Sequence, residues 1–220
     1  MKTFVLNGWA ASPRAWDLCL FPRDRIFGYL EQLDGRPEDA VSRADGGAIL
    51  VGWSMGGSTA LRLVIDYPEK IRGLVLVAAT ARMMKAPNWT GMSPSRLEAL
   101  NYGLRMTLRG EGFFQPRLGV PNPYEADTEE NLERGLKYLE DTDLRLRLID
   151  LMASGRVKCP VHIFQSERDG IVRPENAKFL EAVFPGATVD MVPGGEHALP
   201  VTIPEKIDAA VASITMQAAE

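Results

Sequence analysis

A short apolar segment followed by a serine between glycines decides the fold of this chain. Residues 48–57 read Ala48-Ile49-Leu50-Val51-Gly52-Trp53-Ser54-Met55-Gly56-Gly57. The stretch contains G-x-S-x-G, with a strand candidate directly before it and an amphipathic helix candidate directly after it. This setting is typical of a nucleophile elbow, a sharp turn that exposes a serine and needs small neighbours. Ser54 is therefore the predicted nucleophile, and the alternative is a glycine-rich turn with a structural use only.

Short apolar or β-branched segments alternate with helical segments on both sides of this stretch. The strand candidates are residues 3–6, 25–29, 48–51, 73–78, 161–165 and 188–192, and the flanking helix candidates are residues 58–67, 174–183 and 203–216. Several strands are apolar on both faces, as buried parallel strands are. The alternation predicts an α/β fold with a mostly parallel sheet of about six strands.

The middle of the chain, residues 80–158, interrupts that alternation. It is rich in Met, Arg and Glu, and residues 94–108 and 128–151 have helical spacing, with a break near Asp141. We therefore expect a core made of residues 1–79 and 159–220 and a helical lid, residues 80–158, over the carboxyl edge of the sheet. The alternative is a helical subdomain that only pads the core.

Candidates for a catalytic base are few, because the chain holds only two histidines. A serine nucleophile needs such a base. His162 lies inside an apolar strand candidate, which favours a structural residue of the sheet. His197 lies in a glycine-rich loop after the last strand candidate, from which it can reach Ser54 across the carboxyl edge of the sheet. His197 is the predicted base, and an exposed loop histidine is the alternative.

The base in turn needs a carboxylate that orients it. The chain order Ser…Asp…His predicts this group between residues 54 and 197, at the end of a strand. Asp169 fits because it follows a strand candidate and sits in a tight turn before a helix. Glu167 and Asp143 are the competitors, and a turn aspartate without a catalytic role is the alternative for Asp169.

An oxyanion hole requires two backbone N–H groups aimed at one point. One is expected from Met55, the residue after the nucleophile. The other is expected from the loop after the first strand, where Gly8 permits a close approach and Trp9 offers the best placed N–H. Trp9 and Trp53 are predicted to flank the serine as apolar walls, which is compatible with core packing.

With these residues the chain resembles an α/β-hydrolase over nearly its whole length. It looks like the carboxylesterases that hydrolyse pimeloyl-acyl-carrier-protein methyl ester in biotin synthesis. The matching residues are Leu6-Asn7-Gly8-Trp9, Trp16, Gly52-Trp53-Ser54-Met55-Gly56-Gly57 and Gly194-Gly195-Glu196-His197-Ala198. The resemblance implies the α/β-hydrolase fold, a triad of Ser54, Asp169 and His197, and oxyanion donors at Trp9 and Met55.

Two features depart from that family's pattern. Asn7 stands where the family usually has a histidine before the oxyanion-loop glycine. The chain also starts at the strand that is normally the third, so the N-terminal hairpin of the fold is expected to be missing. Both departures leave the core site intact and concern the choice of substrate.

The middle segment also indicates what the substrate looks like. Its methionines and aromatic residues suit an apolar, chain-like acyl group. Phe113 and Phe114 are therefore predicted to bind substrate together with Trp9 and Trp53. Arg145 and Arg147 lie in a basic stretch that can form a rim for an acidic acyl carrier protein, which the resemblance implies as the substrate's carrier. The alternative is that these arginines are solvated or paired within the chain.

Composition excludes several other classes of protein. The net charge of −4 disfavours non-specific nucleic-acid binding, and no run of 18 apolar residues could span a membrane. The two cysteines are too far apart in the sequence for a zinc motif and suit a reducing cytoplasm. We predict a cytoplasmic serine carboxylesterase that needs no metal or cofactor. The alternatives are a general short- or medium-chain esterase, a carbon–carbon bond hydrolase of the same fold, and a small-molecule binding module.

Overall fold

The computed structural model describes residues 1–108, 123–124 and 127–218. Its centre is a six-stranded sheet in the order β2-β1-β3-β4-β5-β6, in which every neighbouring pair is parallel. The strands are β1 (Lys2–Leu6), β2 (Ile26–Phe27), β3 (Ala48–Trp53), β4 (Ile71–Val77), β5 (Val161–Ser166) and β6 (Thr188–Val192). The predicted α/β class and the parallel sheet of about six strands are confirmed.

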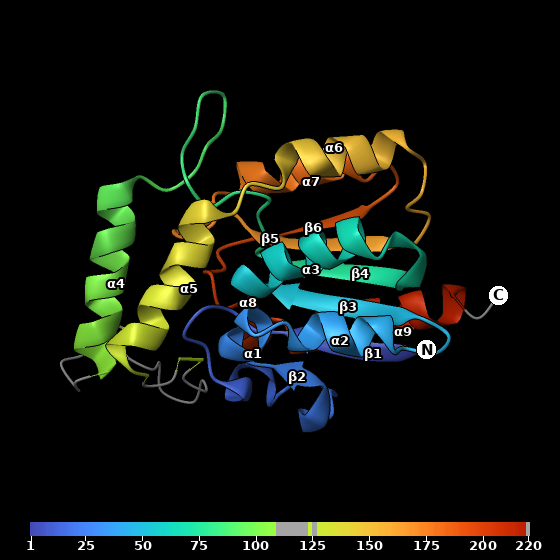
Figure 1. The fold of residues 1–220 in the computed structure, drawn as a ribbon, viewed down its shortest axis with the longest axis horizontal. Helices are drawn as coiled ribbons and strands as arrows, with labels where there is room; N and C mark the ends of the chain where they lie inside the picture. The colour runs from blue at the N-terminus through green and yellow to red at the C-terminus, as the bar shows by residue number, and fades with distance from the viewer. Residues whose placement is uncertain (109–122, 125–126, 219–220) are drawn as a thin grey trace.

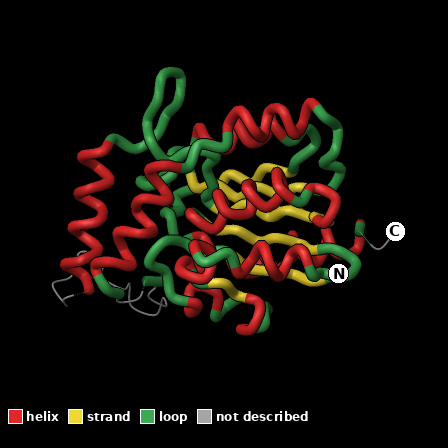
Figure 2. The backbone as a smooth tube through the Cα atoms, in the orientation of Figure 1, coloured by secondary structure: helices red, strands yellow, loops and turns green. Residues whose placement is uncertain are grey.

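Helices cover both faces of this sheet (Figures 1 and 2). They are α1 (Tyr29–Leu33), α2 (Arg36–Ser42), α3 (Met55–Asp66), α4 (Pro94–Leu108), α5 (Glu129–Asp141), α6 (Arg145–Ala153), α7 (Glu175–Val183), α8 (Leu199–Thr202) and α9 (Pro204–Gln217). Successive side chains of β3 pack on opposite faces of the sheet. Leu50 packs in the cluster that includes side chains of α2, α3, α6 and α7, whereas Ile49 and Val51 pack with side chains of α9. Burial on both faces explains the unbroken apolar run of this strand.

The middle segment divides between two places in the fold. Helices α4 and α5 stand beyond the carboxyl edge of the sheet, whereas α6 lies over one face of the sheet beside α7 (Figure 1). Leu148 and Leu151 of α6 belong to the main core cluster. The expected break near Asp141 is the end of α5, and α6 begins four residues later. The assignment of residues 80–158 to a lid stays a prediction.

Candidate active site

Ser54 occupies a strained turn between β3 and α3. Its φ of 56° and ψ of −117° lie in a region that residues with a side chain rarely adopt. The backbone around it is closely packed. A Cβ atom on Gly52 would lie 2.5 Å from the Gly56 carbonyl oxygen, and one on Gly56 would lie 2.0 Å from the Leu6 carbonyl oxygen. Glycine is therefore required on both sides of the serine, as the sequence pattern predicts.

Three side chains that are far apart in the sequence form one hydrogen-bonded series at this turn. His197 Nε2 lies 2.9 Å from Ser54 Oγ, and His197 Nδ1 lies 2.8 Å from Asp169 Oδ2. Ser54 follows β3, Asp169 follows β5 and His197 follows β6, so all three lie at the carboxyl edge of the sheet. All three are buried. The series can carry a proton from the serine to the imidazole while the carboxylate holds the ring.

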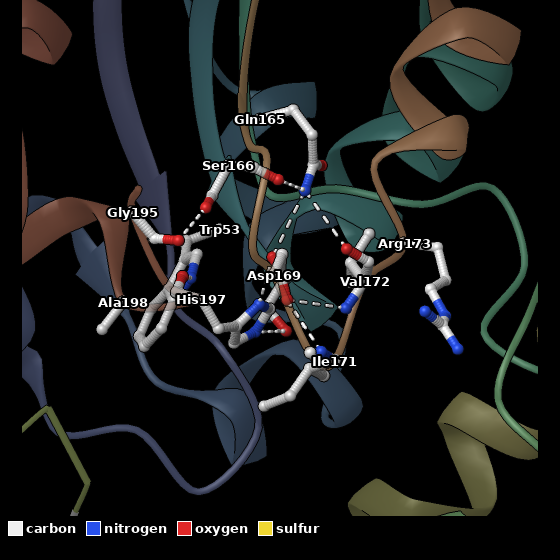
Figure 3. A network of polar contacts seen from close by, with 12 residues as sticks. Trp53, Gln165, Ser166, Asp169, Ile171, Val172, Arg173, Gly195, His197 and Ala198 are labelled. Atoms are coloured by element: carbon white, nitrogen blue, oxygen red, sulfur yellow. Dashed lines mark hydrogen bonds and ion pairs between the residues drawn. The ribbon is translucent and has the colours of Figure 1, made fainter. Parts of the chain in front are cut away.

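The Asp169 carboxylate is surrounded by hydrogen-bond donors (Figure 3). Its Oδ1 accepts the backbone N–H groups of Ile171, at 2.8 Å, and Val172, at 2.9 Å. The side-chain amide of Gln165 lies 3.4 Å from Oδ2. Burial opposes ionisation of this group, but the charge of His197 and the hydrogen bonds together hold the pKa of the Asp169 carboxyl below its usual value. The group is therefore suited to be a permanent anion beside the imidazole.

The competing candidates for the carboxylate and the base have other surroundings. Glu167 is exposed to solvent. Asp143 binds Arg145 and Arg82, and these two guanidinium groups hold the pKa of its carboxyl far below the usual range. His162 pairs with Asp190 at 2.7 Å on the sheet and stacks on the ring of Phe164, with centroids 4.4 Å apart. Its position is that of a structural histidine.

The loop after β1 passes directly over the serine. A Cβ atom on Gly8 would lie 3.4 Å from the Cβ of Ser54, so the approach that the sequence predicts for this glycine is present. Among the residues that the structure describes, neither the Trp9 N–H nor the Met55 N–H donates to another residue. Met55 also begins α3, where the helix dipole adds positive potential. The role of these two N–H groups as oxyanion donors stays a prediction.

Asn7 fixes this loop from within. Its side-chain oxygen accepts the indole N–H of Trp16 at 3.1 Å, and its side-chain amide donates to the Ala11 carbonyl at 2.9 Å. Its own carbonyl accepts the side-chain amide of Gln32 at 2.9 Å. We did not predict this role from the sequence. The available signal was a polar residue at the end of a buried strand, directly before the loop glycine.

An apolar cavity opens from the serine toward α4 and α5. Ser54 and His197 lie in its wall, and the cavity is partly open to solvent. The other described lining residues are Trp9, Met83, Leu100, Leu104, Tyr124, Leu139 and Ile171. None of these described lining residues carries a formal charge, which suits an uncharged acyl chain. Burial, together with the negative charges of Asp169 and Glu196, raises the pKa of the Tyr124 phenol, so it stays a neutral hydroxyl.

The predicted substrate-binding residues have different outcomes. Trp9 lines the cavity. Trp53 instead donates its indole N–H to the His197 carbonyl at 2.9 Å, with its ring centroid 5.6 Å from the imidazole, and so supports the histidine loop. Phe113 and Phe114 lie outside the described residues. Sequence reasoning missed the leucines of α4 and α5, because apolar helix residues carry no signal that separates a cavity wall from a core. It also missed Tyr124, which lies outside the helices and bridges to Ala11 of the loop after β1.

The two arginines proposed for a carrier protein lie on α6 and are paired within the chain. Arg145 binds Asp143 at 2.8 Å, and its guanidinium lies 5.2 Å from the Trp89 ring centroid. Arg147 binds Asp66 at 2.6 Å. Within the described ranges, no group of three or more His, Cys, Asp or Glu side chains could hold a metal ion, and no helix is long and apolar enough to cross a membrane.

Comparison with known proteins identifies relatives over most of the chain. The model of the alpha/beta hydrolase family matches residues 11–210. A pimeloyl-[acyl-carrier protein] methyl ester esterase of Nitrosomonas europaea is 27% identical and covers 92% of this chain and 90% of the relative. An enzyme of the same name from Yersinia enterocolitica is 26% identical, with coverages of 97% and 92%.

Solved structures show the same fold. An esterase from Exiguobacterium antarcticum has a TM-score of 0.73 at 16% identity and covers 98% of this chain and 92% of its own. A bromoperoxidase from Bacillus anthracis has a TM-score of 0.70 at 16% identity, with coverages of 98% and 91%. At this identity the likeness concerns the fold alone.

Proposed function

The chain belongs to the alpha/beta hydrolase family, and from that premise we propose that it is a serine carboxylesterase that forms an acyl-enzyme on Ser54. The observation that supports this most is the buried series from Ser54 through His197 to Asp169, with contacts of 2.9 and 2.8 Å. A cavity begins at the serine, and none of its described lining residues carries a formal charge. This favours an uncharged ester.

The geometry supports a two-step reaction. In the first step His197 Nε2 takes the hydroxyl proton while Ser54 Oγ attacks the ester carbonyl carbon. The carbonyl oxygen becomes an oxyanion that accepts the N–H groups of Trp9 and Met55. The C–O bond to the alcohol then breaks, and the imidazolium gives its proton to the leaving alkoxide. In the second step a water molecule attacks the acyl carbon and His197 takes its proton. The bond from the acyl carbon to Ser54 Oγ then breaks, the imidazolium returns the proton to Ser54 Oγ, and the free acid leaves.

The finer proposal concerns the substrate, the methyl ester of a pimeloyl chain held on an acyl carrier protein. The names of the relatives in Nitrosomonas europaea and Yersinia enterocolitica support it. The apolar walls supplied by α4 and α5 fit the hydrocarbon part of such a chain. The carbon–carbon bond hydrolase and the binding module are the competing hypotheses.

Two measurements test these proposals. A burst of p-nitrophenol from p-nitrophenyl butyrate, with a butyryl adduct on Ser54 in the intact-protein mass, is expected from the wild type and not from Ser54→Ala. A wild type that neither hydrolyses the ester nor forms the adduct would remove the serine esterase. Rescue of a biotin auxotroph that lacks its own esterase is expected from the wild type alone. A burst without rescue would leave a general esterase and remove the biotin substrate.

We propose further that the carrier protein contacts Arg145 and Arg147. Because both guanidinium groups already have carboxylate partners, an acidic carrier would have to exchange with Asp143 and Asp66. Complementary charge of this kind mainly raises the association rate and is screened by salt.

The test compares kcat/KM for a carrier-linked ester and a small ester from about 20 to about 500 mM salt. The carrier-linked substrate alone should decline steeply, and Arg145→Glu with Arg147→Glu should reproduce that loss at low salt. The control pair is Arg36→Glu with Arg43→Glu, which makes the same charge change at exposed positions on and directly after α2. Equal salt responses of both substrates, or equal losses in both pairs, would remove the arginine contact.

A further inference from the structure

The loop that carries the Trp9 N–H contacts the segment around α5 at several points. The indole N–H of Trp9 donates to the Leu132 carbonyl of α5 at 3.1 Å. The Ser12 N–H donates to the Pro123 carbonyl at 2.7 Å, and Ala11 forms a β-bridge with Tyr124. The loop is therefore fastened at Trp9 and at its C-terminal end to a part of the chain outside the sheet.

Gly135 makes the contact between α5 and Trp9 unusually close. A glycine inside a helix costs about 1 kcal/mol relative to alanine, so its presence in the middle of α5 calls for a packing reason. The structure supplies one, because a Cβ atom on Gly135 would lie 2.4 Å from Trp9 Cδ1 and 2.7 Å from Trp9 Nε1. The indole edge occupies the space that any larger residue at position 135 would fill.

Helix α1 holds the opposite side of this contact. The same Cβ atom would lie 3.2 Å from the Tyr29 ring, so the indole and the tyrosine ring both flank Gly135. Tyr29 also hydrogen-bonds Asp127, just before α5, and Arg134 of α5 pairs with Asp34 after α1 at 2.7 Å. Helix α5 is thus held against α1, with the Trp9 side chain beside them.

We propose that Gly135 and Leu132 are positioning residues that aim the Trp9 N–H at the oxyanion through the indole. The inference rests on the proposed function, because it assigns a support to the oxyanion donor of that reaction. The indole is joined to the Trp9 backbone by two side-chain bonds, and its bond to the Leu132 carbonyl and its contact with Gly135 restrict rotation about them. A displacement of the ring that this rotation does not absorb is passed on to the backbone N–H. A donor acts only within hydrogen-bond distance of the developing oxyanion, and loss of one donor lowers kcat by about 10²- to 10³-fold.

The test is Gly135→Ala, assayed with p-nitrophenyl butyrate. We expect kcat and the burst rate to fall about 10- to 100-fold, because the donor is displaced rather than removed, with KM changed less than about 3-fold. The control is Lys137→Ala, an exposed position of the same helix, which should keep the wild-type kcat. A wild-type kcat in Gly135→Ala would overturn the inference.

A double-variant cycle separates this role from a general effect on the helix. Trp9→Ala removes the ring and keeps the backbone N–H, so Gly135→Ala should lower kcat less than about 2-fold further in that background. An equal loss in both backgrounds would show that Gly135 does not act through Trp9, and would overturn the inference.

A second variant covers the case in which Gly135→Ala does not fold, as judged by its melting temperature and circular dichroism. Trp9→Phe keeps an aromatic ring but loses the bond to the Leu132 carbonyl and the edge of the indole that contacts Gly135, and it should lower kcat about 3- to 10-fold. An unchanged kcat there would overturn the inference. A wild type without any ester hydrolysis would instead be a failure of the proposed function, so the two failures are distinguishable.

Discussion

The sheet core and the helices beyond its carboxyl edge contribute to the site in different ways. The core supplies Ser54, Asp169 and His197 from short loops, and backbone hydrogen bonds hold those loops in place. Helices α4 and α5 supply leucine side chains to the cavity wall. Reactive groups are thus positioned by backbone geometry, which a short motif specifies, whereas the cavity is shaped by side-chain packing, which many sequences satisfy.

Strained backbone positions are also more frequent at the carboxyl edge of the sheet core than in the described part of residues 80–158. Among the described residues, four that are not glycine have a positive φ: Ala10, Ser54, Ala78 and Asn88. The first three follow β1, β3 and β4 at the carboxyl edge of the sheet. Only Asn88 belongs to residues 80–158. Strained positions collect at functional sites when the surrounding structure holds them there.

The largest expected effect tests whether the chemistry belongs to the core. Ser54→Ala and His197→Ala should each lower kcat by about 10⁶-fold, because nucleophile and base act as a unit. His162→Ala removes the other histidine of the chain, which pairs with Asp190 on the sheet, and should keep kcat within about 3-fold. Initial rates with p-nitrophenyl butyrate measure all three. Inactivation by His162→Ala alone would transfer the role of base to His162 in β5.

The next effect concerns the carboxylate. Asp169→Asn should lower kcat by about 10⁴-fold and leave the fold intact, because an amide favours the wrong imidazole tautomer. Glu167→Gln and Asp143→Asn are the matched controls, since one side chain is exposed and the other is paired with arginines. Wild-type activity in Asp169→Asn, together with loss in either control, would transfer the role to that control residue.

Much of the fold is predictable because its determinants are local. The strand candidate 188–192 and the helix candidate 94–108 match β6 and α4 at both ends. Helices α1 and α2 were missed because they are short and lack a clear apolar period. Helix α1 depends on a tertiary feature as well, since Gln32 binds the carbonyl of Asn7.

The residues of the candidate site likewise fall into those that local sequence identifies and those that only the tertiary structure places there. Ser54, Asp169 and His197 each follow a strand and belong to a recognisable loop, so the sequence brings them forward as candidates. Leu100 and Leu139 lie in the cavity wall only because α4 and α5 stand beyond the edge of the sheet. Nothing local in the chain specifies that placement. The indole of Trp53 supports the histidine loop, and its predicted contact with substrate stays a prediction.

A smaller effect tests the helical wall. Esters of medium-chain acids should have a kcat/KM about 10-fold above that of acetate esters, since each buried methylene contributes about 0.8 kcal/mol at most. Leu100→Phe replaces an aliphatic side chain of the cavity wall by a larger aromatic ring. It should remove most of that preference and leave kcat/KM for acetate esters unchanged. Tyr102→Ala is the control, because this side chain of the same helix is 65% exposed. A preference that survives Leu100→Phe would mean that the acyl chain binds elsewhere.

The smallest expected effect is on stability and concerns the strain in the core. Ser54→Gly should raise the free energy of unfolding by about 1 kcal/mol, although it abolishes activity. Glycine adopts the φ of 56° and ψ of −117° without the clash that costs a substituted residue about 1–3 kcal/mol. Glycine also has more conformational freedom in the unfolded chain, which lowers the free energy of unfolding by about 0.5–1 kcal/mol and offsets part of the stabilisation.

Thermal unfolding measures the outcome, and for a chain of this length the expected rise in melting temperature is about 2–4 °C. The control is Ser213→Gly, at an exposed position inside α9, where helical backbone offers no strain to relieve. That variant should lose about 0.5–1 kcal/mol, through the same unfolded-state freedom. Opposite signs at the two serines would show that the site stores strain which ordinary helix does not. Equal losses at both would mean that the elbow holds Ser54 at no cost, and the contrast between the two regions would then rest on hydrogen bonding alone.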